Sequence, residues 1–145
     1  MLLKTDFNVL LIDDNIKQAG IIIETLEISS TNKINVFWHK SGYTALDFLN
    51  TEGNPVISVI LLEIEISDSL GEEIVIQIKS DFSLHRNIPI VIFSNSTNFS
   101  QVKYFFSLGI NSWVKKPPDP DMLRKKLNTI REFWFNHAIL PTTLT

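Results

Sequence analysis

Carboxylate, hydroxyl and amine side chains stand at the ends of four apolar runs in this 145-residue chain. They are Asp13 with Asp14, Glu63, Ser94 and Lys116. If those runs are parallel strands, their carboxyl ends lie at one edge of a sheet, so these groups converge although they are far apart in the sequence. Converging carboxylates repel one another, and a divalent cation together with the Lys116 ammonium would offset that repulsion. The sequence therefore predicts a charged site at one edge of a parallel sheet.

The elements that must position these groups are visible in the hydrophobic pattern. Strands are predicted at residues 7–12, 34–39, 56–63, 88–93 and 112–115. The third run is solidly apolar up to Glu63, which is typical of a central strand buried on both faces. Helical periodicity follows each strand; Gly109 ends the fourth helix, and Asp119 caps a last helix that extends to about Ala138. This alternation favours a doubly wound, three-layer α/β domain.

Composition and length limit the possible functions. We expect one domain over residues 1–145, with a core at about 7–138, a C-terminal tail at 139–145 and no attached output module. The net charge of −3 and pI of about 5.5 offer no general attraction to DNA or to anionic membranes. Cysteine is absent, so disulfides and thiolate sites are excluded. With no long apolar run, a soluble cytoplasmic protein is expected.

The order of these motifs resembles that of response-regulator receiver domains over almost the whole chain. The resemblance is carried by the acidic opening Val9–Asn15, the acceptor strand that ends at Glu63, Gly71 in the following loop, Ser94 as the switch hydroxyl, and Lys116-Pro117. It implies a flavodoxin-like (CheY-like) five-stranded parallel sheet in the order 2-1-3-4-5. Taken alone, each motif has a simpler reading, since Asp-Asp-Asn after a strand is often only a helix cap.

The resemblance also implies roles for the site residues. Asp13, Asp14 and the acceptor Glu63 would hold Mg²⁺ together with the main-chain carbonyl of Glu65, a set that suits the preference of Mg²⁺ for a few hard oxygen ligands. The acceptor carboxylate would take a phosphoryl group from the phosphohistidine of a histidine kinase, while Lys116 and Ser94 bind its oxygens. A cis peptide bond before Pro117 is implied as well.

Two positions depart from the family pattern. Glu63 stands where the acceptor is normally Asp, and Ser67 stands where proline often follows. The added methylene moves the carboxylate about 1.5 Å outward. Because a misplacement of about 1 Å can slow a positioned reaction roughly a hundredfold, Glu63 is expected to accept phosphate weakly or not at all. Asp68 lies in the loop beyond the strand and is not expected to substitute for it.

Aromatic residues near the C-terminus suggest a contact surface. Phe133, Trp134 and Phe135 are consecutive, and neighbours on a helix point about 100° apart, so they cannot all face one core. The last helix also resembles that of the stand-alone receivers associated with bacterial phytochromes, which implies a phytochrome-type kinase and a homodimer through the fourth and fifth helices, with Tyr104, Phe105 and Phe106 adding apolar area. Simple packing against the sheet is the alternative. Trp113 matches the switch aromatic of the family, with core packing as its alternative.

The sequence thus predicts a single-domain response regulator in a two-component phosphorelay, made atypical by Glu63. The main alternative is a protein-interaction or dimerisation module that keeps the receiver fold without needing phosphorylation. An enzyme such as a small phosphatase would need a nucleophilic Asp at the strand end, which this chain lacks. The protein is therefore expected not to be an enzyme.

Overall fold

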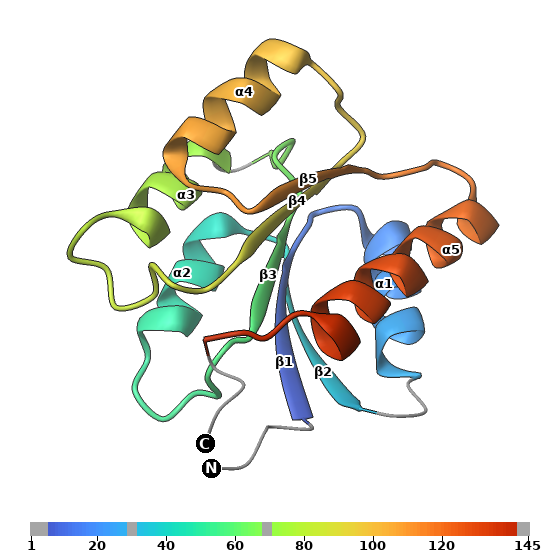
Figure 1. Ribbon diagram of the computed structural model, residues 1–145, viewed down its shortest axis with the longest axis horizontal. Coiled ribbons are helices and arrows are strands. Elements are labelled where there is room, and N and C mark those ends of the chain that lie inside the picture. The colour runs from blue at the N-terminus through green and yellow to red at the C-terminus, as the bar shows by residue number, and fades with distance from the viewer. Residues whose placement is uncertain (1–5, 29–31, 68–70, 142–145) are drawn as a thin grey trace.

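A five-stranded parallel sheet in the order β2-β1-β3-β4-β5 forms the centre of the protein in a computed structural model that describes residues 6–28, 32–67 and 71–141 (Figure 1). The strands are β1 (Asp6–Ile12), β2 (Lys33–His39), β3 (Val59–Leu62), β4 (Ile90–Ser94) and β5 (Ser112–Lys115). The helices are α1 (Ile16–Glu27), α2 (Gly42–Asn50), α3 (Gly71–Lys79), α4 (Phe99–Leu108) and α5 (Pro120–Arg131), followed by a π-helical turn, η1 (Glu132–His137). The predicted doubly wound fold and strand order are confirmed.

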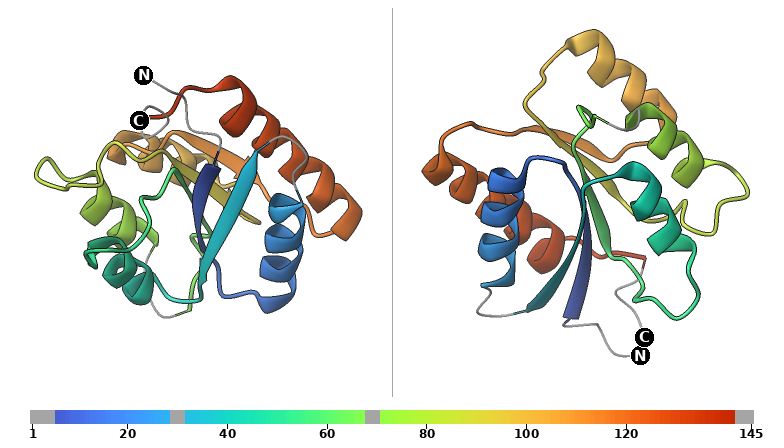
Figure 2. Two further views of the ribbon diagram at one scale, coloured as in Figure 1. Left: turned by 90° about the horizontal axis from the view of Figure 1, so that it is seen from below. Right: turned by 180° about the vertical axis from the view of Figure 1, so that it is seen from behind.

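Helices cover both faces of the sheet and give three layers. α1 and α5 pack on one face, and α2, α3 and α4 lie on the other, as the view from behind shows (Figure 2). β1, β3 and β4 lie inside the sheet, and all four residues of β3 are buried. This double burial explains why the central run is continuously apolar.

Local sequence signals set the helix ends. The side chains of Asn15, Ser41, Asn98 and Asp119 accept backbone N–H bonds at the starts of α1, α2, α4 and α5. Gly109, at φ 107°, ends α4 in the left-handed conformation as predicted. β3 is shorter than the predicted run of residues 56–63, so Glu63 lies one residue beyond the strand.

The last helix differs from the prediction. α5 ends at Arg131, and η1 follows with a wider turn in which the N–H of Ala138 donates to the carbonyl of Phe133 at 2.7 Å. A π turn contains one extra residue, so the inward position moves from Trp134 to Phe135. Phe135 is buried with its ring 4.8 Å from that of Phe7, while Trp134 is only half-buried.

Two further expectations concern the tail and the Lys116–Pro117 bond. Leu140, in the predicted tail, is buried against the core, and residues 142–145 lie outside the described ranges. The expected cis bond is wrong, because every described peptide bond is trans; the trans form is favoured by about 0.5–1 kcal/mol even before proline. No helix in the described ranges is long and apolar enough to cross a bilayer.

Candidate functional site: an acidic pocket closed by a lysine

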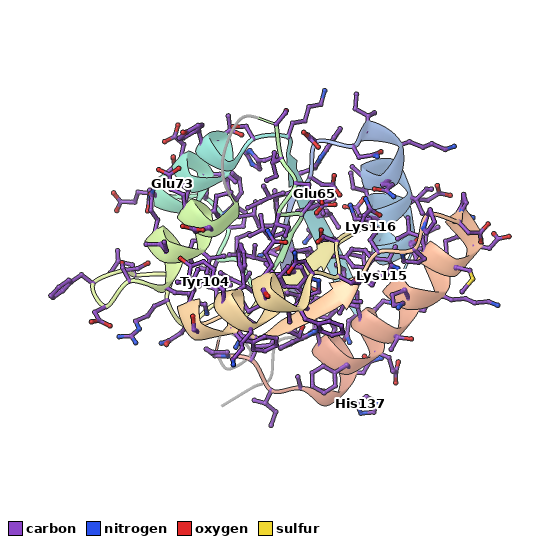
Figure 3. All side chains as sticks on the ribbon, turned by 90° about the horizontal axis from the view of Figure 1, so that it is seen from above. Glu65, Glu73, Tyr104, Lys115, Lys116 and His137 are labelled. Atoms are coloured by element: carbon purple, nitrogen blue, oxygen red, sulfur yellow. The ribbon has the colours of Figure 1, made fainter. Side chains whose placement is uncertain are left out.

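The sheet brings the predicted site residues together at its carboxyl edge. Asp13 follows β1, Glu63 follows β3, Ser94 ends β4 and Lys116 follows β5, and all four side chains are buried. Among the described residues only Ser58 joins them as a buried polar side chain. Figure 3 looks onto this edge and labels Lys116 and Glu65 near the strand ends (Figure 3). The convergence expected from parallel strand ends is therefore present.

Lys116 occupies the middle of the acidic pocket. Its Nζ donates to Oδ2 of Asp13 at 2.6 Å, to Oε1 of Glu63 at 3.1 Å and to the side-chain oxygen of Gln18 at 3.1 Å. One ammonium thus balances part of the charge of two buried carboxylates, and its three N–H bonds are all used. We call this set of residues, Asp13, Glu63, Gln18 and Lys116, the lysine-centred cluster. The ammonium and the two buried carboxylates are paired, which offsets the cost of burying their charges.

Backbone groups hold the remaining carboxylate oxygens. The N–H of Asn15 donates to Oδ1 of Asp13 at 2.9 Å, and the N–H of Glu65 donates to Oε2 of Glu63 at 3.3 Å. Both oxygens of Glu63 are therefore engaged, one by Lys116 and one by the main chain. Burial raises the pKa of Asp13 above its ordinary value, and the neighbouring Lys116 charge and hydrogen bond lower it only in part.

The other predicted metal ligands are Asp14 and the main-chain carbonyl of Glu65. Asp14 is half-buried, and its Oδ2 accepts the N–H of Ser67 at 3.0 Å; the side chain of Glu65 is exposed. No group of three acidic, histidine or cysteine side chains in the described part of the chain is placed to hold a metal ion. The Lys116 ammonium lies between the two buried carboxylates of the predicted ligand set.

Ser94 and Trp113 are linked through a third residue. Oγ of Ser94 accepts the N–H of Ser96 at 3.2 Å, and the indole N–H of Trp113 donates to the carbonyl of Ser96 at 3.0 Å. The Trp113 ring packs edge-on to Phe105 with centroids 5.7 Å apart. The predicted switch pair is thus adjacent, and Trp113 also takes part in packing, as the alternative reading expected.

The predicted contact aromatics divide into two groups. Tyr104 on α4 and Phe133 on η1 are exposed, as is Phe106 (47%), and Trp134 is half-buried. Phe105 and Phe135 are only 3% and 6% exposed, so their assignment to an interface is wrong. Phe105 faces the sheet from α4, and Phe135 is turned inward by the π turn.

Sequence reasoning missed Gln18 and Ser96. Gln18 lies in the first turn of α1, three residues after the capping Asn15, and thus one turn from the acidic pair. That spacing was the available signal, because a first-turn side chain after a strand points toward the same edge of the sheet. Ser96 acts partly through its backbone, which side-chain chemistry alone does not reveal.

A parallel sheet in this order with an acidic pocket, a lysine and a hydroxyl at its carboxyl edge defines a class of signalling domain. The model of the response regulator receiver domain matches residues 9–128, and the chain belongs to that family. Receiver domains are response-regulator modules of two-component signalling.

Individual proteins of known name and solved structures are also similar to this chain. The chain is 30% identical to the probable methanogenesis regulatory protein FilR2 of Methanothrix harundinacea over 132 residues, covering 88% of this chain and 83% of FilR2. It is 27% identical to the response regulator Rcp1 of Synechocystis, with 92% of each chain covered. Among solved structures, the phosphorylated cyanobacterial phytochrome response regulator RcpA is similar at a TM-score of 0.87 and 28% identity, over 94% of this chain and 99% of that one.

Proposed function

We propose that this receiver is atypical: the lysine-centred cluster keeps its acidic pocket closed, and Glu63 accepts a phosphoryl group weakly or not at all. The observation that carries the proposal is the double engagement of the Glu63 carboxylate by Lys116 at 3.1 Å and by the Glu65 N–H at 3.3 Å. An acceptor oxygen must be free and in line with the phosphorus. Each oxygen of Glu63 already accepts one hydrogen bond in this arrangement, which restricts the direction in which it can reach a phosphorus atom.

The direct test is chemical phosphorylation. The protein is incubated with acetyl phosphate and Mg²⁺, and its intact mass is measured over time. The proposal predicts little or no gain of mass. A stable gain of one phosphoryl group that is lost in Glu63→Gln would overturn it, because Gln keeps the size of the side chain but replaces the nucleophilic carboxylate with a neutral amide.

We also propose that a divalent cation binds only weakly. Asp13, Asp14, Glu63 and the Glu65 carbonyl supply the hard oxygens that Mg²⁺ prefers, but the cation must compete with the Lys116 ammonium for two of the carboxylates. A neighbouring solved structure is the Mn²⁺-bound form of Rcp1. Titration calorimetry with Mg²⁺ tests the proposal: Lys116→Met should bind more tightly than the natural protein, and equal affinities would refute the competition.

The proposal also covers the binding partners of the receiver. The likeness to phytochrome response regulators supports a histidine kinase of the phytochrome type as the upstream partner. The net charge of −3 favours action through protein contacts rather than direct DNA or membrane binding, in the cytoplasm. A pull-down of the kinase that persists in Glu63→Gln would separate binding from phosphorylation.

A second candidate function is a phosphorylation-independent contact module. The exposed rings of Tyr104, Phe106 and Phe133 favour it, since they place apolar area on α4 and η1 beside β5. Self-association through this face predicts concentration-dependent sedimentation that Phe133→Glu abolishes and Asp14→Ala leaves unchanged. A monomer at every concentration would remove the dimer from this proposal.

A further inference from the structure

The chain segment that follows β3 donates two backbone N–H groups to carboxylates of the acidic pocket. The N–H of Glu65 donates to Oε2 of Glu63 at 3.3 Å, and the N–H of Ser67 donates to Oδ2 of Asp14 at 3.0 Å. The first bond is local, but the second joins residues 53 positions apart in the sequence. It therefore connects the loop after β1 to the loop after β3, at the edge of the sheet where these neighbouring strands end.

Buried neighbours fix the position of the Ser67 N–H. Ile64 and Ile66 are buried in the core on the α2 and α3 side of the sheet, while Ser67 itself is exposed. The start of α3 packs directly on this segment, because a Cβ atom at Gly71 would lie 2.9 Å from the Cα of Ile64. Ser67 follows an anchored residue, so its N–H is presented to Asp14 by the main chain and not by a rotating side chain.

The bond to Asp14 depends on position 67 not being proline. Ser67 is one of the two positions at which this chain departs from the family pattern, where proline often follows. Proline has no backbone N–H and could not donate to Asp14. The donor is the main-chain nitrogen, so the serine hydroxyl is not part of this bond. The departure at residue 67 thus supplies a hydrogen-bond donor that the family's usual residue lacks.

The three carboxylates expected to hold a cation are thus held by two different donors. The Lys116 ammonium binds Asp13 and Glu63, and the Ser67 N–H binds Asp14. The hydrogen of an N–H group carries partial positive charge, so it repels a cation that approaches the same oxygen. It also directs the carboxylate toward its own loop. A cation that binds Asp14 through this oxygen must therefore displace the Ser67 N–H.

We propose that the Ser67 N–H is a latch that competes with a divalent cation for Asp14, so that cation binding releases Ser67, at the start of the β3–α3 loop, from the β1–α1 loop. The inference rests on the proposed function in taking Asp14 as a cation ligand, and it adds an obstacle that is independent of Lys116. Coupling of this kind is reciprocal: the latch weakens cation binding by the same factor by which the cation weakens the latch.

Amide hydrogen exchange, followed residue by residue by NMR, tests the latch in the natural protein. The Ser67 amide should exchange faster as Mg²⁺ is added, and Asp14→Ala should make it exchange fast without Mg²⁺. The Gln18 amide is the internal control, because it donates at the same distance, 3.0 Å, to the neutral side chain of Asn15 beside the pocket, and its exchange should not change. Unchanged exchange at Ser67, when calorimetry shows at least half of the protein bound to Mg²⁺, would overturn the proposal.

Two substitutions of the same residue supply a matched pair. Ser67→Pro removes the N–H, and Ser67→Ala removes only the hydroxyl and keeps the N–H. Calorimetry with Mg²⁺ should show about tenfold tighter binding by Ser67→Pro than by Ser67→Ala, because a hydrogen bond to a charged group no longer competes, and Ser67→Ala should match the natural protein. Equal affinities of the two variants would overturn the latch. Circular dichroism checks that both variants fold, and if Ser67→Pro does not, the exchange experiment decides.

Lys116→Met separates the latch from the competition proposed above. The two obstacles act on different carboxylates, so the gains in Mg²⁺ affinity of Lys116→Met and Ser67→Pro should multiply in the double variant. Tighter binding by Lys116→Met with equal affinities of Ser67→Pro and Ser67→Ala would overturn the latch alone. Tighter binding by Ser67→Pro with no gain in Lys116→Met would support the latch and refute the competition by the lysine.

Discussion

Shortening the acceptor side chain tests the central geometric argument. Glu63→Asp removes one methylene and draws the carboxylate back by about 1.5 Å. The distance from Lys116 Nζ to the carboxylate, 3.1 Å in the natural protein, then increases to about 4.6 Å if the backbone holds its place. Lys116 keeps its bond to Asp13 at 2.6 Å, so the pocket remains partly neutralised while its acceptor oxygen becomes free.

The expected outcome is a gain of function. A misplacement of about 1 Å costs roughly a hundredfold in a positioned reaction, so Glu63→Asp should be phosphorylated by acetyl phosphate about a hundredfold faster than the natural protein. Intact-mass spectrometry at fixed times measures both rates, and Glu63→Gln serves as the unreactive control. The reasoning is refuted if the natural protein and Glu63→Asp react at similar rates, since the length of the side chain would then not limit the reaction.

Three further outcomes follow from the same contacts. Lys116→Met leaves two buried carboxylates without their cation and should lower the free energy of unfolding at neutral pH by about 3–5 kcal/mol in urea titrations; a loss under 1 kcal/mol would contradict the role of the lysine-centred cluster. The pKa of Asp13 is raised above its ordinary value of 3.8 in the folded state, so between the unfolded-state and folded-state pKa values the folded protein binds more protons than the unfolded chain. The contribution of Asp13 to the free energy of unfolding therefore falls as pH rises through that interval. Asp13→Asn should remove this pH dependence of stability, and an unchanged pH dependence would disprove the argument. Arg131→Ala removes 2.7 Å bonds to the carbonyls of Thr25 and Ile28 that join α5 to α1, and should lower stability by about 2 kcal/mol without changing phosphorylation; an unchanged denaturation midpoint would contradict this.

The gathering of Asp13, Glu63, Ser94 and Lys116 was predictable because it follows from topology. A buried parallel strand reads as an unbroken apolar run, and the carboxyl ends of such strands share an edge. The exact pairing within the pocket was not predictable. Whether Lys116 lies between the carboxylates or beside them depends on side-chain distances of about an ångström, which residue types and spacing do not encode.

The inward or outward direction of the aromatic residues was the least predictable feature. Tyr104, Phe105 and Phe106 are three consecutive aromatic residues, so the sequence pattern does not indicate which side of α4 faces the sheet. The burial of Phe105 depends on how the helix lies on the sheet. The π turn at η1 shifts the inward-facing side of the helix by one residue, so that Phe135 faces the core in place of Trp134. Such a turn has no strong sequence signature, because its single extra residue is stabilised by tertiary packing.

The bond from the Val36 N–H to Glu27 also bears on polymerisation. An unprotected strand at each margin of a sheet allows molecules to stack end to end without limit, which is how many fibrils grow. Here the N–H of Val36 in β2 donates to a carboxylate oxygen of Glu27 in α1 at 3.0 Å, so this margin of the sheet is partly closed to another strand. Replacing Glu27 with alanine would expose the N–H of Val36 and favour edge-to-edge association through β2.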